Sequence, residues 1–384
     1  MKQKTPKQAG GGKAAAPTPR IAKVATVALR HPIDGALRNP LFKWSEKITL
    51  LVFVGTEDGT IGVGEAWCAL GSPAPIEAFI KNDVEPELIG QDVTLSEAIV
   101  KSFRRRTALS SRKSETDKAL SAIDIALWDI KGKLARMPVW RLLGGCDARV
   151  RAYASGGLYR DGQSPEAFAE VHAREVRSGF GAVKIKVGGA SLPEDVARVG
   201  ALREAIGPDA TLMVDGVASL SVPRATELAR ALVPFRIKWF EQPLVNENIE
   251  GLAAVRRDGG LPIAGNENEA GLDAFRRLIG SGAVDYVQFD PVVSGGFTEG
   301  RKIAALAEAY HLPVTIHHSN SVVSMLANVH LAAAVPNCDS IEYHMIHRQL
   351  FGEVPADWLT AKDGHLTAPE APGLGVDLSA YVPW

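Results

Sequence analysis

The chain has 384 residues, of which 46% are hydrophobic and 23% charged, so it is long enough for two structural units and too evenly composed for a disordered or fibrous protein. Lys and Arg number 43 against 44 Asp and Glu, a formal net charge of -1, so no excess positive field is available to bind nucleic acid. The three cysteines, Cys68, Cys146 and Cys338, are too few and too scattered for a disulfide framework, which favours a reducing cytoplasm.

Residues 1–20 are rich in Lys, Gly, Pro and Ala and contain no apolar run. Such a segment cannot bury enough surface to order itself, so we expect a disordered tail rather than a secretory signal. No later window offers the roughly 18 consecutive apolar residues of a membrane span, so no membrane partner is expected.

Residues 21–147 are predicted to form an α+β domain. Two strand-like runs, 48–54 and 60–66, flank a turn that contains Glu57, Asp58 and Gly59, which predicts a β-hairpin. Helical periodicity follows at Pro75–Ile89, Leu95–Thr107 and Glu115–Leu143.

Residues 148–344 alternate short strands with helical stretches. The predicted strands are 151–155, 182–187, 211–216, 237–242, 262–267, 286–290, 314–318 and 340–344. Eight strands alternating with helices at a spacing of roughly 25 residues favour a TIM-type barrel over an open doubly wound sheet. The closing segment, 345–384, is rich in Pro and Gly and is expected to return to the first domain.

Polar side chains stand at the carboxyl ends of the barrel strands, where the chemistry of such barrels is located. In chain order they are Lys184, Lys186, Asp215, Glu241, Glu267, Asp290, His317 and Glu342. Asp215, Glu241 and Glu267 follow one another at intervals of 26 residues, one βα repeat. Neighbouring carboxylates repel one another unless a cation lies between them, and oxygen ligands without a thiolate suit Mg²⁺, with Mn²⁺ as an alternative.

Two kinds of acid-base group flank these carboxylates in the strand order. Lys186 lies one strand before them, and burial beside Lys184 and a cation is expected to lower its pKa. His317 lies beyond them, and Asp290 can hold its ring in one tautomer. His318, the next residue of the strand, is expected to face the helices in a structural role.

These motifs resemble those of the mandelate racemase-like branch of the enolase superfamily. The resemblance is carried by Lys184-Ile185-Lys186, Asp215, Trp239-Phe240-Glu241-Gln242-Pro243, Gly265-Asn266-Glu267-Asn268, residues 288–296, His317 and the 123–129 helix, and it extends over nearly the whole chain from about Ile21. It implies an α+β capping domain on a modified (β/α)7β barrel.

The resemblance also implies roles for the residues at the strand ends. Asp215, Glu241 and Glu267 would hold Mg²⁺, while Lys186 and the His317/Asp290 pair would be the acid-base catalysts. Lys184 would help to hold the substrate carboxylate, and Glu342 would hydrogen-bond there. This chain departs from the family at Val217, where asparagine is frequent, and at Phe289, where proline is common.

The implied reaction is removal of a proton α to a carboxylate, most simply in the dehydration of an acid sugar to a 2-keto-3-deoxy acid. Reprotonation on the opposite face would instead make the enzyme a racemase or epimerase, and a sugar-lactone cycloisomerase is a further alternative. Polar residues between His31 and Lys47 are expected either to contact the substrate or to form a surface loop. We expect a homo-oligomer.

A different class of enzyme, a Schiff-base aldolase, would use Lys184 or Lys186 as its nucleophile, with Gly295 and Gly296 binding phosphate. It has no need for three carboxylates on consecutive strands. A non-catalytic binding protein on the same fold is the third interpretation.

Overall fold

The computed structural model describes residues 18–35, 37–43, 45–68, 71–107, 113–351 and 360–384. Residues 1–17 of the predicted tail lie outside the described residues. Its last residues contact the chain that follows helix α2 (Glu85–Leu88), because Thr18 donates a hydrogen bond to Asp92 at 2.7 Å and Arg20 donates one to the Gly90 carbonyl at 2.7 Å. Among the described helices, none combines the length and the apolar character needed to cross a membrane.

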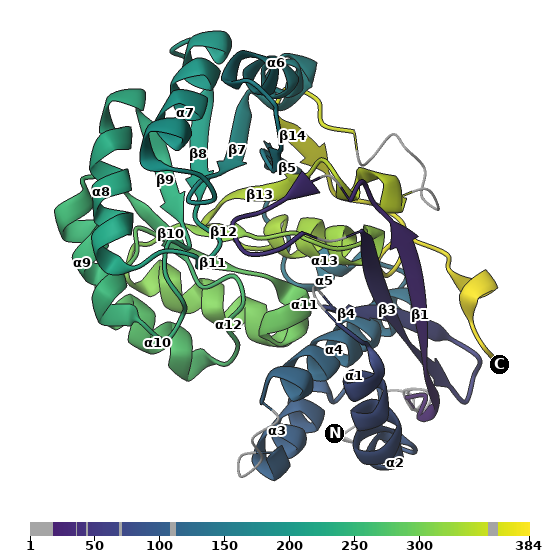
Figure 1. The fold of residues 1–384 in the computed structure, drawn as a ribbon. Helices are drawn as coiled ribbons and strands as arrows, with labels where there is room; N and C mark the ends of the chain where they lie inside the picture. Colours follow the sequence, from purple (N-terminus) through teal and green to yellow (C-terminus); the bar gives the residue numbers. More distant parts are fainter. Residues whose placement is uncertain (1–17, 36, 44, 69–70, 108–112, 352–359) are drawn as a thin grey trace, which may run out of the picture.

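The first part of the chain forms a three-stranded antiparallel sheet covered by helices (Figure 1). Its strands lie in the order β1 (Ile21–Pro32), β3 (Glu46–Thr56) and β4 (Ile61–Ala66). Its helices are α1 (Ala74–Phe79), the π-helical turn η1 (Ile80–Val84), α2, α3 (Ser96–Thr107) and α4 (Lys113–Ala135). A Cβ atom at Gly62 or Gly64 would lie 2.1 or 1.8 Å from an α4 carbonyl oxygen, so these two glycines let the helix lie directly on β4.

The second part is a closed barrel of eight parallel strands, which confirms the predicted fold class. The strands lie in the order β5 (Arg149–Ser155), β7 (Ala182–Lys186), β8 (Thr211–Asp215), β9 (Ile237–Glu241), β10 (Ile263–Gly265), β11 (Tyr286–Phe289), β12 (Val314–Ile316) and β13 (Cys338–His344). β13 pairs with β5 and closes the ring.

Helices follow the first seven barrel strands and lie outside the ring, as Figure 1 shows for α6 to α10 and α12. They are α6 (Pro165–Glu175), α7 (Leu192–Ile206), α8 (Val222–Leu232), α9 (Ile249–Gly259), α10 (Leu272–Gly280), α11 (Pro291–Ser294) with α12 (Gly296–Ala309), and α13 (Val322–Ala332). Short helical turns occur at η2 (Val176–Phe180), η3 (Val233–Phe235), η4 (His347–Phe351) and η5 (Ser379–Tyr381).

Strand alternation determines which side chains reach the barrel axis. In β7, Val183 and Ile185 belong to the apolar layer between the strands and the helices. Lys184 and Lys186 therefore point the other way, into the barrel. Beneath them, Tyr153 and Trp239 help to fill the interior in a separate small apolar cluster.

One predicted helix is wrong in part. The sequence pattern from Glu115 to Leu143 forms two helices, α4 and α5 (Val139–Leu142), rather than one. Arg136 adopts a left-handed conformation with φ of 54°, and Pro138 precedes α5 in an extended one. A proline cannot donate the helical hydrogen bond and disfavours helix in the residue before it, which explains the break.

The closing segment contacts both parts of the molecule. Strand β14 (His365–Thr367) pairs antiparallel with β5 at the start of the barrel. Further on, the Leu374 amide donates to Asp129 of α4 at 2.8 Å, and the Trp384 ring lies beside Gly55 of β3. The short strands β2 (Leu37–Arg38) and β6 (Tyr159–Arg160) join the loop after β1 to the first barrel loop.

Candidate active site

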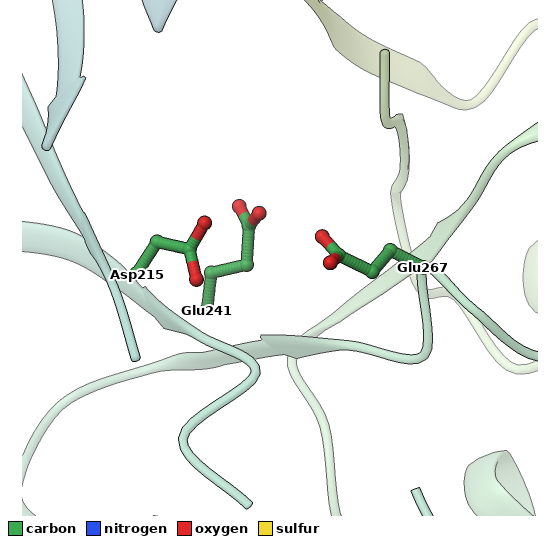
Figure 2. A group of neighbouring side chains, drawn as sticks. All are labelled: Asp215, Glu241 and Glu267. Atoms are coloured by element: carbon green, nitrogen blue, oxygen red, sulfur yellow. The ribbon is translucent and has the colours of Figure 1, made fainter. Parts of the chain in front are cut away.

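Three carboxylates converge at the carboxyl ends of consecutive barrel strands. Asp215 ends β8, Glu241 ends β9, and Glu267 follows β10 by two residues. One oxygen atom from each lies within 4.8 Å of the other two, and all three side chains are buried (Figure 2). The three residues that the 26-residue spacing singled out are therefore brought together.

The backbone around these carboxylates is held in unusual conformations. Positive φ angles occur at Val217 (51°) and Ala218 (54°) after Asp215, at Gln242 (37°) after Glu241, and at Asn266 (82°) before Glu267. Non-glycine residues are strained in this region, and for β-branched Val217 the strain is greatest. Side-chain oxygens hold two of these positions, because the Val217 amide donates to the Asp215 carboxylate at 2.8 Å and the Asn266 amide donates to the Gln242 side-chain carbonyl at 2.7 Å.

Two buried lysines reach the same carboxylates. Lys184 is 0% exposed; it pairs with Glu241 and lies 3.1 Å from Glu342 and 3.6 Å from Asp215. Lys186 pairs with Asp215. Burial alone would lower the pKa of Lys186, but the carboxylates of Asp215, Glu342 and Glu241 together outweigh it and raise the pKa. The lowered pKa expected from Lys184 and a bound cation together stays a prediction for the site with its metal ion bound.

The donor set fits a hard divalent cation. Burial, together with the nearby carboxylates of Asp215 and Glu342, raises the pKa of Glu241 well above its ordinary value despite its contact with Lys184. In addition, Glu267 Oε2 is a buried oxygen with no hydrogen-bond donor among the described residues. Crowded carboxylate oxygens without a sulfur ligand match the preferences of Mg²⁺.

His317 lies on the other side of the carboxylates, beside Asp290. The ring Nδ1 is 2.9 Å from an Asp290 oxygen, and Nε2 lies 3.5 Å from Glu267 and 3.8 Å from Glu342. Burial favours the neutral ring, but the three carboxylates outweigh it and raise the pKa of His317 to about 9. Because Asp290 occupies Nδ1, the other ring nitrogen is the one that faces the site.

His318 points away from the site, as predicted from strand alternation. It is fully buried, and its Nε2 lies 3.2 Å from the Ser321 carbonyl at the start of α13. Burial lowers the pKa of His318 to about 4, which keeps the ring neutral.

A cavity of about 110 Å³ adjoins the carboxylates. From the barrel it is lined by Leu158, Lys186, Val217, Glu267, Asn268, His317, Ser319 and His344, and from the first domain by Asn39, Phe42, Lys47 and Trp67. The cavity is thus covered by residues from a different part of the chain than those that hold the carboxylates.

The 31–47 segment, which the sequence offered as either a substrate contact or a surface loop, is divided between the two. Asn39 and Lys47 line this cavity, whereas His31 lines a separate cavity between the sheet and the start of α13. Asp34 forms an ion pair with Arg160. Arg38 donates to the Gly189 carbonyl at 3.1 Å, Lys43 is exposed, and residue 44 lies outside the described residues.

Sequence reasoning missed three lining residues that carry polar atoms, Trp67, Ser319 and His344. His344 stands two positions after Glu342 on β13, so the alternation that placed Glu342 would also have placed His344 on the same face. Trp67 follows β4, and no local pattern in the sequence connects it with the barrel.

The chain is a capped barrel, and its strand ends hold three converging carboxylates between a lysine and a histidine-aspartate pair. This combination defines a class of metal-dependent acid-base enzymes. Residues 167–382 match the family described as enolase C-terminal domain-like, and residues 22–144 match the mandelate racemase / muconate lactonizing enzyme N-terminal domain. The chain therefore belongs to the mandelate racemase / muconate lactonizing enzyme family of the enolase superfamily.

Individual relatives cover nearly the whole chain. It is 36% identical over 360 residues to a 3,6-anhydro-alpha-L-galactonate cycloisomerase of Streptomyces coelicolor, covering 93% of this chain and 97% of that one. It is 33% identical to an arabinonate dehydratase of Saccharolobus solfataricus, covering 84% of this chain and 86% of the relative. The crystal structure of a racemase from Streptomyces coelicolor with bound magnesium superposes with a TM-score of 0.86 at 34% identity, covering 94% of this chain and 98% of that one.

Proposed function

We propose that this enzyme removes the proton α to the carboxylate of an acid sugar in a Mg²⁺-dependent reaction and dehydrates the sugar to a 2-keto-3-deoxy acid. The observation that carries the proposal is the buried cluster of Asp215, Glu241 and Glu267 with an acid-base group on each side. The dehydratases among the relatives support it. Residues 21–147 would form the cap over a barrel of residues 148–344.

Asp215, Glu241 and Glu267 would hold the magnesium ion. Bound there, Mg²⁺ supplies positive charge where the substrate carboxylate becomes more negative as the α-proton leaves. Lys184 would support the same charge, and Glu342, 3.1 Å from its ammonium group, would keep that lysine in place.

Lys186 and His317 would move the protons. Burial and Lys184 favour the neutral amine of Lys186, whereas the carboxylates around it favour the ammonium form. In its neutral form Lys186 would accept the α-proton at Nζ. His317, held by Asp290 at Nδ1, donates a proton from Nε2 to the β-hydroxyl as its C–O bond breaks. Water leaves, and the enol that remains tautomerises to the 2-keto acid.

The same groups support isomerisation when no hydroxyl leaves. Proton removal on one face and return from the other gives a racemase or epimerase, and the cycloisomerase relative keeps a lactone- or anhydro-ring reaction as an alternative. A Schiff-base aldolase is disfavoured, because both lysines are buried in ion pairs with carboxylates.

A panel of mono- and dicarboxylic acid sugars with Mg²⁺ tests the proposal, with 2-keto acid formation and stereochemical change measured in parallel. We expect activity that EDTA abolishes and Mg²⁺ restores, with no adduct trapped by borohydride. Turnover that persists in EDTA, or a trapped lysine adduct, would contradict the proposed chemistry.

A further inference from the structure

Three residues that line the cavity carry a charged amine or a ring nitrogen that the proposed reaction leaves unused. They are Lys47 at the start of β3, Trp67 just after β4, and His344 at the end of β13. We call these three residues the distal wall. Two come from the first domain and one from the barrel, so the wall exists only when the two parts are packed together.

Lys47 brings a buried positive charge to this wall. The side chain is 4% exposed, and its Nζ lies 3.2 Å from both the carbonyl and the hydroxyl oxygen of Ser319. These bonds fix the ammonium group beside the cavity. Burial lowers the pKa of Lys47 to about 8, so the group still carries its charge at neutral pH.

Trp67 and His344 contribute nitrogen atoms with unfilled hydrogen-bonding capacity. Trp67 Nε1 and His344 Nδ1 are buried and have no hydrogen-bond partner among the described residues. The His344 side chain is 5% exposed, and its ring is stacked on His347 with centroids 4.1 Å apart and planes 11° apart, so the ring orientation is fixed. Burying a polar atom without a partner is costly, which favours a ligand that supplies an acceptor to the Trp67 N–H, and to His344 in the tautomer that carries its proton on Nδ1.

The charges of the cavity lining indicate the chemistry of that ligand. Among the described residues that line the cavity, Glu267 is the one carboxylate, and the proposed function assigns it to the metal. Glu342 and Glu65 lie close enough to raise the pKa of Lys47, but Glu342 is 3.1 Å from Lys184, and Glu65 accepts hydrogen bonds from Ser321. Lys47 therefore brings to the cavity lining a positive charge that the proposed reaction does not use.

We infer that the distal wall is a second carboxylate subsite and that the enzyme prefers dicarboxylic acid sugars to their monocarboxylic counterparts. One carboxylate would lie at the metal end of the cavity, and the other would accept hydrogen bonds from Lys47, Trp67 and His344. This inference rests on the proposed function and names its substrate class.

The test compares substrates that differ at one group. Each acid sugar that the wild-type enzyme turns over is paired with the counterpart that exchanges a terminal CH2OH for a carboxylate, for example galactonate with galactarate. The kcat/KM ratio of the two is measured with Mg²⁺ for the wild type, Lys47→Met, Lys47→Arg and Trp67→Phe. Lys43→Gln is the matched control, since it removes a positive charge from the same segment at an exposed position.

We expect the wild type to favour the diacid. Lys47→Met should reduce that kcat/KM preference by about tenfold to a hundredfold, which corresponds to the free energy of one charge-assisted hydrogen bond. Lys47→Arg should restore part of the preference, Trp67→Phe should lower it by a smaller factor, and Lys43→Gln should leave it unchanged. If Lys47→Met fails to fold, Trp67→Phe carries the test, because it deletes one N–H group and keeps an aromatic ring.

A wild type that prefers monoacids, or variants that slow both members of a pair equally, would overturn the subsite and leave the proposed function standing. Absence of both turnover and α-proton exchange with every acid sugar would overturn the proposed function and the subsite with it.

Discussion

Glu65 provides a direct test of how the sheet of the first domain is joined to the barrel. This β4 residue is fully buried, and its carboxylate accepts hydrogen bonds from the Ser321 hydroxyl at 2.6 Å, the Ser324 amide at 2.9 Å and the Ser321 amide at 3.3 Å. These donors lie at the start of α13. Burial outweighs them and raises the pKa of Glu65 from 4.5 to about 7.

We predict that Glu65→Gln stabilises the protein at alkaline pH and has little effect at acidic pH. An acid whose pKa is raised by folding contributes stability below its unfolded value, 4.5, and that contribution is lost as the pH rises through the folded value, about 7. At about 1.4 kcal/mol per pH unit, the difference between these two values corresponds to about 3 kcal/mol. Glutamine resembles the protonated acid in shape and does not ionise.

The measurement is urea unfolding of both proteins at several pH values between about 4.5 and 8. The free energy of unfolding of Glu65→Gln relative to the wild type should rise by about 3 kcal/mol across this range. Glu57→Gln, which removes an exposed acid from the nearby hairpin turn, is the control and should follow the wild-type profile. Parallel profiles for Glu65→Gln and the wild type would refute the reasoning.

Three further predictions concern the candidate active site. Glu241→Gln should abolish Mg²⁺-dependent activity with the fold retained, because it removes an anionic ligand at nearly constant volume; wild-type turnover at saturating Mg²⁺ would contradict this. Trp239→Phe removes the indole N–H that lies 3.2 Å from Glu241, and should weaken Mg²⁺ binding by about tenfold in a metal titration, whereas unchanged affinity would show that this contact does not orient the ligand. In D2O, His317→Asn should stop turnover but retain α-proton exchange on the face that Lys186 addresses, and Lys186→Met should show the reverse; loss of exchange with every substrate configuration in both variants would exclude two independent bases.

Much of the barrel could be predicted because local patterns determine it. Each predicted strand from 151–155 to 340–344 overlaps an observed one, since parallel strands in a barrel are short apolar runs at regular intervals. The convergence of Asp215, Glu241 and Glu267 followed from the same regularity, because equivalent positions of consecutive strands meet at one end of the barrel.

The features that escaped prediction depend on contacts between distant residues. The distal wall combines residues 47, 67 and 344, which no spacing in the sequence relates. The pKa of Lys186 depends on which carboxylate its ammonium group meets, and that requires the register of β7 against β8, in which Lys186 stands opposite Asp215. Pro138 was visible in the sequence, but the helical periodicity on both sides of it concealed the break.

The order of the strands has a consequence for the synthesis of the chain. The three clustered carboxylates lie on β8, β9 and just after β10, whereas closure of the barrel requires β13 to pair with β5, for example Ile341 with Ala152. A ribosome therefore completes the whole carboxylate set before it has made Asp290, His317 or the closing strand. Contacts between residues so far apart form slowly, so the three acids are synthesised well before the barrel can close and hold them together.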